Sequence, residues 1–373
     1  MRVAVVGTGA FGRNHLRVYR ELETAGLGVA LVAAIEPDAA RAAETAQKYA
    51  IPVFATAEAL LSADLRVDAA TVSVPTVHHH AVASQLLDAG LDLLVEKPLA
   101  ANLDEADDLI QRAENGHVGK GSLILQPGHL ERFNPAILAV EQRLHRPMFF
   151  ESHRLSIFGP RALDVDVVLD LMIHDLDIVL CFARSEVCEV RAVGLPILSP
   201  KVDIANVRVE FESGCVANFT ASRVSTEKVR KLRFFEPRQY VSVDYARQDL
   251  LVIRMDESLN GGSGIVGGLP PEIAAALASG KADPALLAKL AAAAGVTGSG
   301  PAPGLSFVKP EVTPGEPLRL ELLAFLDAVR TRRSPRVTAR QGRNALALAL
   351  EIQATMVAHA KRAGLEDFFN PGM

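Results

Sequence analysis

Lys97, Asp170 and His174 are the residues of this sequence whose types and spacing best suit catalysis. Lys97 stands in a Glu-Lys-Pro tripeptide that directly follows the apolar run Leu93–Val95, and Asp170 precedes His174 by four residues. Residues four apart share one face of an α-helix. A lysine ammonium can donate to a hydroxyl, and histidine is the side chain best suited to proton transfer near neutral pH. Lys97 is therefore a candidate to bind a substrate hydroxyl, and His174, with the Asp170 carboxylate one turn away, is a candidate to transfer a proton.

The segment Val167–Phe182 is predicted to form one helix that carries this Asp–His pair. Asp177 and Cys181 extend the same polar stripe, and the opposite side of the helix is apolar. Burying an unpaired carboxylate costs on the order of a few kcal/mol, so the stripe must either face water or line a polar cavity. The segment alone leaves both interpretations open.

A glycine-rich turn near the N-terminus predicts a dinucleotide site. It matches the pattern G-x-G-x-x-G, follows the apolar run Val3–Val6 and opens a predicted helix at about 13–25. The first glycine permits the tight turn, the second lets the backbone approach a pyrophosphate, and the third lets helix and strand pack closely. The N–H groups at the start of the helix hold the anion. The residues expected to bind the cofactor here are Gly7, Gly9, Ala10, Phe11 and Gly12.

An acidic residue completes this pattern and indicates which dinucleotide binds. Glu36 follows the next apolar run, Val29–Ile35, where a carboxylate can accept hydrogen bonds from a ribose 2′-hydroxyl and would repel a 2′-phosphate. The residue after it is Pro37 rather than an arginine. The sequence therefore favours NAD over NADP as the cofactor.

The elements that must position these groups predict an α/β protein that begins with a doubly wound Rossmann domain over residues 1–126. Apolar runs alternate with helical patterns, which is typical of a parallel sheet covered on both faces. The predicted strands are Val3–Val6, Val29–Ile35, Ala69–Val74, Leu91–Val95 and Ser122–Gln126, with helices at about 13–25, 38–49, 79–89 and 103–114.

The remaining residues, 127–373, predict a second α/β domain with a mostly antiparallel, open sheet. Its predicted strands are longer and more alternating: Phe149–Leu155, Val187–Gly194, Val207–Glu212, Val216–Ser222, Lys231–Phe235 and Gln239–Asp244. Helices are expected at Val167–Phe182, Leu318–Arg332 and Arg340–Ala363. Residues 257–310 are rich in Gly, Ala and Pro and predict an insertion, either mobile or serving as an oligomer contact or a lid.

Composition excludes several classes of protein. The 373 residues carry a formal net charge of −5, so a nucleic-acid partner is not expected. The three cysteines form no C-x-x-C pair, and the run His78–His80 has diverging side chains, so neither a disulfide framework nor a metal site is expected. No apolar run approaches the roughly 20 residues of a membrane span, and no signal-peptide pattern opens the chain. We expect a soluble, cytoplasmic protein.

The order of these motifs resembles that of the Gfo/Idh/MocA oxidoreductase family. The segment Pro75-Thr76-Val77-His78-His79, which leads through Gly90 to the Glu-Lys-Pro tripeptide, and the ending around Glu316–Phe325 are also similar. The resemblance covers nearly the whole chain outside 257–310. It implies a Rossmann domain, a second domain whose open sheet packs against another subunit, and hydride transfer between NAD(P) and a sugar or cyclitol carbon.

The resemblance also assigns roles to particular residues. It implies that Lys97, Asp170 and His174 form the catalytic group, with Lys97 or His174 as the main base. Residues along the nicotinamide half of the cofactor would be Pro75, His79, Glu96 and Lys97, and the Lys97–Pro98 peptide would be cis.

The segment Gly128–Pro135 is similar to the subgroup of this family that oxidises the 3-hydroxyl of UDP-N-acetylglucosamine. Guanidinium groups suit a diphosphate, because they pair with it through two parallel hydrogen bonds, although such arginines can equally be ordinary surface residues. The implied substrate-binding residues are Arg132, Asn134, Arg154, Arg161 and His174. The alternatives are an inositol or free-sugar dehydrogenase and a non-catalytic NAD-binding regulator of the same fold.

Overall fold

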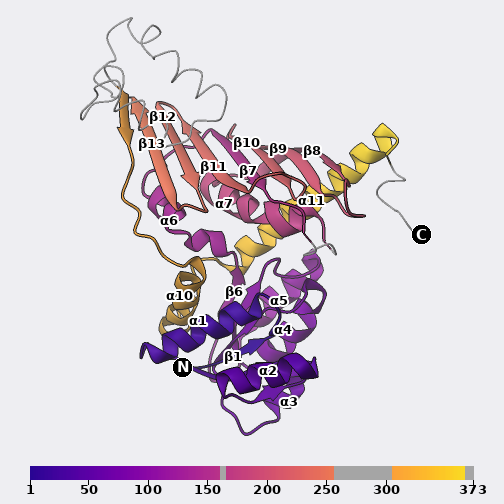
Figure 1. Ribbon diagram of the computed structural model, residues 1–373, viewed down its shortest axis with the longest axis vertical. Coiled ribbons are helices and arrows are strands. Elements are labelled where there is room, and N and C mark those ends of the chain that lie inside the picture. Colours follow the sequence, from indigo (N-terminus) through magenta and orange to yellow (C-terminus); the bar gives the residue numbers. More distant parts are fainter. Residues whose placement is uncertain (160–164, 256–304, 366–373) are drawn as a thin grey trace, which may run out of the picture.

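Two sheets organise the chain, and each has its own hydrophobic core. The computed structural model describes residues 1–159, 165–255 and 305–365. Figure 1 shows the first sheet at one end of the molecule and the larger second sheet at the other, with helices between them. The predicted residue Arg161 and most of the predicted insertion lie outside the described residues.

The first sheet is parallel throughout, in the strand order β3-β2-β1-β4-β5-β6. This order reverses at β1, which is the crevice where doubly wound sheets bind their ligands. Its strands are β1 (Arg2–Val6), β2 (Ala30–Ile35), β3 (Val53–Phe54), β4 (Ala69–Val72), β5 (Asp92–Glu96) and β6 (Leu125–Gly128). Its helices are α1 (Gly12–Thr24), α2 (Ala39–Tyr49), α3 (Ala57–Leu61), α4 (His79–Asp88) and α5 (Leu103–Asn115). The predicted doubly wound parallel sheet is confirmed.

The second sheet has the order β14-β13-β12-β11-β7-β10-β9-β8 and is antiparallel except for the pair β7–β10. The predicted mostly antiparallel sheet is therefore confirmed. Its strands are β7 (Phe149–Leu155), β8 (Val187–Leu195), β9 (Ile204–Phe211), β10 (Val216–Ser222), β11 (Val229–Glu236), β12 (Gln239–Asp244), β13 (Asp249–Met255) and β14 (Leu305–Val308). The sequence did not predict β13 or β14.

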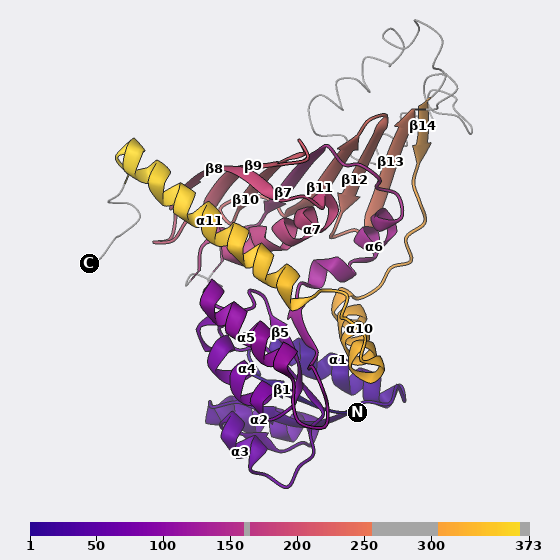
Figure 2. The same cartoon turned by 180° about the vertical axis from the view of Figure 1, so that it is seen from behind.

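Helices cover one face of this sheet and leave the other face open (Figure 2). The covering helices are α6 (Pro135–Glu141), α7 (Ile173–Ala183) and α11 (Ala339–Ala363). Along β7 the residues that face these helices are buried, while their neighbours are only partly so. The same alternation along β9 and β10 gives the sheet one apolar and one mixed face.

Strand β14 falls inside the segment that was predicted to be an insertion. Met255 at the end of β13 pairs with Leu305 at the start of β14. The end of β13 and the start of β14 therefore lie side by side, and β14 forms the edge of the sheet. This strand could not be predicted, because Leu305–Val308 is too short to show a strand period.

The first core is completed by a helix from the far end of the chain. Helix α10 (Pro317–Thr331) packs beside α1 (Figure 1). Its Leu322, Phe325 and Leu326 are fully buried among residues of β1 and α1. Strand β6 also crosses the boundary expected at residue 126. The core of the first sheet thus includes a helix that comes after the second sheet in the sequence.

No helix among the described residues has the length and apolar run that a membrane crossing needs.

Candidate active site

A cavity of about 580 Å³ lies at the carboxyl ends of β1, β2 and β4. Its wall includes the glycine turn, the end of β2 and the turn after β4. Of the residues predicted to bind the cofactor, Gly7, Gly9, Glu36 and Pro75 line it. This is the crevice in which an open parallel sheet is expected to hold a dinucleotide.

The glycine turn is too tightly packed to carry side chains at its two ends. Gly7 has a φ of +83°, in the left-handed region that favours glycine. A Cβ on Gly12 would lie 1.8 Å from the carbonyl oxygen of Gly7, so α1 could not start this close to β1 with any other residue. Around Gly9 there is open space within 4 Å. The turn therefore leaves room at the position where a pyrophosphate would approach, and the residues present fit a dinucleotide.

Glu36 links the glycine turn to the start of α2. Its carboxylate accepts hydrogen bonds from the amide and hydroxyl of Thr8 (3.0 and 2.9 Å), from the amide of Asp38 (3.0 Å) and from Arg41 (2.9 Å). Burial alone would raise its pKa, but these hydrogen bonds outweigh burial and lower the pKa to about 2. Glu36 is therefore ionised at any working pH, which suits a partner with free hydroxyls.

Replacing Glu36 with alanine is expected to shift preference from NAD towards NADP. The substitution removes the charge that would repel a 2′-phosphate and releases Arg41 to pair with that phosphate. We expect KM for NAD to rise roughly tenfold, the value of one charged hydrogen bond, and KM for NADP to fall. Steady-state kinetics with both cofactors measures this. The double variant Glu36→Ala/Arg41→Ala should lose the gain for NADP; a gain that persists would contradict the role of Arg41.

Other residues of the predicted cofactor set lie around the cavity rather than in its wall. Ala10 and Phe11 lie on the turn before α1, and the Phe11 ring is 37% exposed. His79 is buried, with its two ring nitrogens near the carbonyl oxygens of Pro98 (2.8 Å) and Val74 (2.9 Å). It therefore ties the turn after β4 to the turn after β5, and its neighbour His78 lines the cavity instead.

Glu96 and Lys97 follow β5, and the Lys97–Pro98 peptide is cis, as predicted. The Glu96 carboxylate lies 3.0 Å from the ring of His15 on α1, so it joins the end of β5 to the helix of the glycine turn. No motif in the sequence singles out His15. Lys97 points instead towards the second unit of the protein.

The Lys97 ammonium contacts the start of the helical segment that carries Asp170 and His174. Its Nζ donates to the carbonyl oxygen of Asp170 at 2.7 Å and lies 3.4 Å from that of Leu169 and 3.9 Å from the Asp170 carboxylate. Burial lowers the pKa of Lys97, while the carboxylates of Asp170 and Glu96 act in the opposite direction. The structure thus brings together a lysine of the first unit and an aspartate of the second.

The helix that carries Asp170 begins differently from the prediction. Residues Val168–Met172 form a π-helical turn (η3), and the regular helix α7 starts only at Ile173. Asp166 caps this start by accepting from the amides of Val168 and Leu169 at 2.9 and 3.0 Å. A π turn disturbs the regular pairing of helix carbonyls and is frequent at functional sites. In this turn two carbonyl oxygens face the ammonium of Lys97, which no sequence periodicity indicates.

His174 lies one turn beyond Asp170, at the start of α7, and is partly exposed. Burial lowers its pKa well below the usual value, and the positive charges of Lys97 and Arg154 lower it further. Its Nδ1 is buried and has no hydrogen-bond partner in the described part of the chain. The ring is therefore neutral at neutral pH and able to accept a proton.

Arg154 belongs to a buried ion-pair group rather than to an open surface. Its guanidinium donates to both carboxylate oxygens of Asp175 (2.7 and 2.9 Å) and to Glu131 (3.0 Å). Burial opposes its charge, but the two carboxylates outweigh burial and raise its pKa well above the usual value. The predicted substrate residue Arg154 thus uses its hydrogen bonds within the protein, and Asp175, which the sequence analysis passed over, is its main partner.

The other substrate residues predicted around Gly128–Pro135 are also buried. The Arg132 guanidinium lies 3.5 Å from the Asp177 carboxylate. The Asn134 side chain caps α6 by accepting from the amide of Ala136, and it donates to the carbonyl oxygen of Tyr245 at 3.0 Å. Asp177 is 2% exposed and lies against Arg132, so this part of the predicted polar stripe is buried inside the protein.

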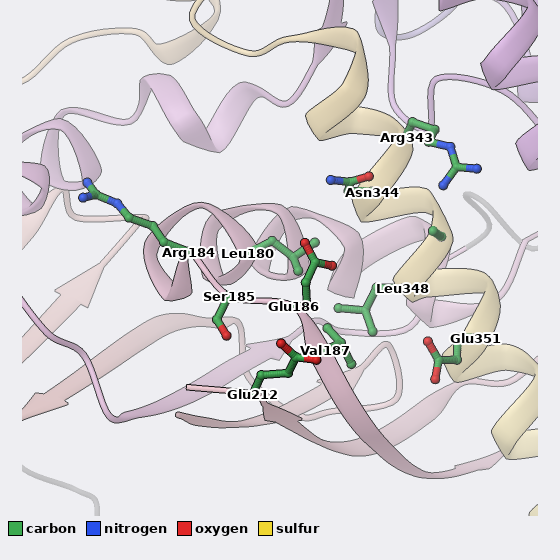
Figure 3. Close-up of a pocket in the computed structure, with 11 residues that line it drawn as sticks. Leu180, Arg184, Ser185, Glu186, Val187, Glu212, Arg343, Asn344, Leu348 and Glu351 are labelled. Carbon is green, nitrogen blue, oxygen red and sulfur yellow. The ribbon is translucent and has the colours of Figure 1, made fainter. Parts of the chain in front are cut away.

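A second cavity, of about 710 Å³, opens between the end of α7, the start of β8 and α11 (Figure 3). Its wall carries both charges, with Arg184 and Arg343 among three glutamates. Arg343 pairs with Asp107 of α5 at 2.8 Å, so this cavity also borders the first unit. None of the described residues predicted to bind cofactor or substrate lines it.

Comparison with known proteins identifies the family. The model of an oxidoreductase family with an NAD-binding Rossmann fold matches residues 1–119, and the model of the GFO/IDH/MocA C-terminal domain matches residues 136–238. The UDP-N-acetylglucosamine 3-dehydrogenase of Acidithiobacillus ferrooxidans is 38% identical over 271 residues, covering 72% of this chain and 80% of the relative. The chain belongs to the Gfo/Idh/MocA oxidoreductase family. The predicted resemblance, the oxidoreductase class and NAD as cofactor are thereby confirmed.

A solved structure of the same relative and one further dehydrogenase extend this comparison. A solved structure of the A. ferrooxidans enzyme has a TM-score of 0.77 and 32% identity, covering 96% of this chain and 98% of that one. The scyllo-inositol 2-dehydrogenase (NAD(+)) of Bacillus subtilis is 27% identical over 240 residues, covering 60% of this chain and 72% of its own. Both relatives are dehydrogenases, in line with the predicted activity.

Proposed function

We propose that this protein is an NAD-dependent dehydrogenase that oxidises a ring hydroxyl of a UDP-N-acetylhexosamine, most specifically the 3-hydroxyl. The proposal rests on one contact: the Nζ of Lys97 donates to the carbonyl oxygen of Asp170, in the π-helical turn that precedes His174. Lys97 follows β5, the strand next to those that form the dinucleotide cavity. The relative with 38% identity, which acts on UDP-N-acetylglucosamine, supports the choice of substrate.

In this proposal NAD, when bound, accepts the hydride from the ring carbon. The protein residues handle the hydroxyl that this carbon bears. A ring nitrogen of neutral His174 accepts the hydroxyl proton, and the Nζ of Lys97 donates a hydrogen bond to the same oxygen as its negative charge grows. Asp170 keeps the ammonium of Lys97 charged and in place, since its carboxylate and its carbonyl oxygen both lie close to Nζ.

These roles predict the pH dependence of kcat/KM. His174 must be neutral to accept a proton, and its pKa lies well below 6.5, so activity should stay level down to pH 6.5 and fall only in more acidic solution. Lys97 must be charged to donate, and its pKa is lowered from 10.5, so the alkaline decline should begin below that pH. Initial rates between about pH 5 and pH 10 measure both limbs. An acidic limb centred above pH 6.5 would exclude His174 as the group that must be neutral.

A comparison of substrates tests the proposed function directly. Purified protein is incubated with NAD and, in separate reactions, UDP-N-acetylglucosamine, free N-acetylglucosamine or myo-inositol, and NADH formation is followed. We expect reduction with the nucleotide sugar at a kcat/KM well above the other two. Preference for myo-inositol would instead support the second candidate, an inositol dehydrogenase, which the similarity to the B. subtilis enzyme favours. No reduction with any sugar would support a non-catalytic NAD-binding regulator.

We also infer a cytoplasmic homo-oligomer that associates through the open face of the second sheet. That face carries a row of aromatic side chains, with Phe149 against Phe235 and Phe235 against Tyr240 at ring-centre distances of 5.2 and 5.1 Å. Aromatic residues are enriched at protein interfaces. Light scattering after gel filtration measures the mass, and a monomer would exclude this assembly.

A further inference from the structure

Arg230 opens β11 on the face of the sheet that is covered by helices. It lies directly opposite Arg154 of β7 in the strand register, and its carbonyl oxygen accepts from the amide of Tyr245 at 3.0 Å. Leu232 and Phe234, which follow it on the same face, are fully buried. Because side chains alternate along a strand, Arg230 lies on the same helix-covered face as these two residues. It lies at the end of the strand, where this face is no longer buried.

The two neighbouring arginines are in opposite situations. Arg154 is 3% exposed, donates to Asp175 and Glu131, and stacks over the Tyr245 ring at 5.0 Å. Arg230 is exposed, and in the part of the chain that the structure describes it has no carboxylate partner. Like charges directly opposite one another on two strands are destabilising. The charge of Arg154 is compensated by two carboxylates inside the protein, whereas the charge of Arg230 is exposed to solvent.

The open charge of Arg230 acts on the catalytic region. Arg154, which lies opposite Arg230 in the strand register, donates to Asp175 at 2.7 Å, and Asp175 directly follows His174. Arg230 therefore lies near the imidazole, and its positive charge helps to lower the pKa of His174. The dinucleotide cavity is lined by residues of the first sheet, whereas Arg230 lies on β11 of the second sheet. We therefore expect Arg230 to contact the substrate rather than the cofactor. A cation that is exposed, unpaired and close to the reacting group is suited to an anionic part of the substrate.

We propose that Arg230 binds the diphosphate of the nucleotide-sugar substrate, an inference that rests on the function proposed above. Two features support it over the arginines that the sequence singled out. The fork of a guanidinium matches two phosphate oxygens, and no carboxylate among the described residues accepts a hydrogen bond from Arg230. Its place near His174 lets one substrate reach Arg230 with its diphosphate and the histidine with its ring hydroxyl.

Three variants of the full-length protein test the proposal. Arg230→Gln removes the charge, and Arg230→Lys keeps the charge but not the fork. The control is Arg191→Gln, which removes an exposed guanidinium from edge strand β8 of the same sheet. We expect Arg230→Gln to raise KM for UDP-N-acetylglucosamine roughly 10- to 100-fold with a smaller change in kcat, and Arg230→Lys to raise it less. KM for NAD should stay at the wild-type value in all three.

Calorimetric titration with UDP in the presence of NADH separates this proposal from the proposed function. Wild type and Arg191→Gln should bind UDP, and Arg230→Gln should bind it roughly 10- to 100-fold more weakly. If the wild type binds UDP in this way but does not oxidise the nucleotide sugar, the anion site stands and the proposed function fails. If the nucleotide sugar is oxidised with the same KM by Arg230→Gln and wild type, or if only KM for NAD changes, the role of Arg230 is overturned.

Discussion

Replacing Lys97 with methionine is expected to lower kcat by roughly 10²- to 10⁴-fold, the usual value of a group that handles charge or a proton in the transition state. Methionine has a similar length and no charge, so the buried space stays filled. Lys97 donates to Asp170 through its Nζ, and the substitution removes this atom. Initial rates with saturating NAD and nucleotide sugar measure the loss.

The accompanying binding measurement shows whether the loss is chemical. The wall of the dinucleotide cavity does not include Lys97, so NADH should bind to Lys97→Met with nearly the wild-type Kd. Lys48→Met, at an exposed position on α2, is a control for the loss of one positive charge and should keep wild-type activity. Turnover by Lys97→Met at the wild-type rate would contradict the catalytic role, whatever its affinity for NADH.

Replacing Arg154 with methionine is expected to lower the free energy of unfolding by roughly 3–5 kcal/mol at neutral pH, since a buried ion pair that loses one partner leaves uncompensated charge. In this variant two buried carboxylates, Asp175 and Glu131, lose their cation. A buried carboxylate without a cation is costly only while it is charged, and acid removes that charge. The loss of stability should therefore be small near pH 4 and should grow as the pH rises.

Urea unfolding at about pH 5 and pH 8 measures both the size and the pH dependence of this loss. The triple variant Arg154→Met/Asp175→Asn/Glu131→Gln removes all three charges and should recover much of the stability at pH 8. Arg191→Met, on the exposed edge of the sheet, should unfold as the wild type does. A midpoint for Arg154→Met that equals the wild-type value at pH 8 would show that the buried pair contributes nothing to stability.

The sequence predicted those parts of the site that depend on local order along the chain. The glycine turn, Glu36 and Lys97 each follow a strand, and parallel strands bring their carboxyl ends to one edge. The pairing of Lys97 with Asp170 also followed from the motifs and the family that they resemble. These predictions depend on regular helices and strands, whose positions are indicated by the spacing of apolar residues and by turn residues.

The remaining features depend on contacts between distant segments. The π-helical turn at Val168–Met172 has the same apolar pattern as an ordinary helix, so it has no signature in the sequence. In the sequence Arg154 cannot be distinguished from a surface arginine. Its burial and its pairing with Asp175 arise only because β7 packs against α7. Arg230 was not singled out because exposure and lack of a partner are properties of the folded chain only.

The helix α10 also affects how the protein must be made. Its buried leucines and phenylalanine complete the core around β1 and α1, yet they follow all strands of the second sheet in the sequence. During synthesis the nucleotide-binding half has an uncovered apolar groove until residues 318–329 have left the ribosome. Domains generally fold in the order in which they are made, but this one must wait for α10, so the nascent chain is a candidate for protection by chaperones until that helix has been made.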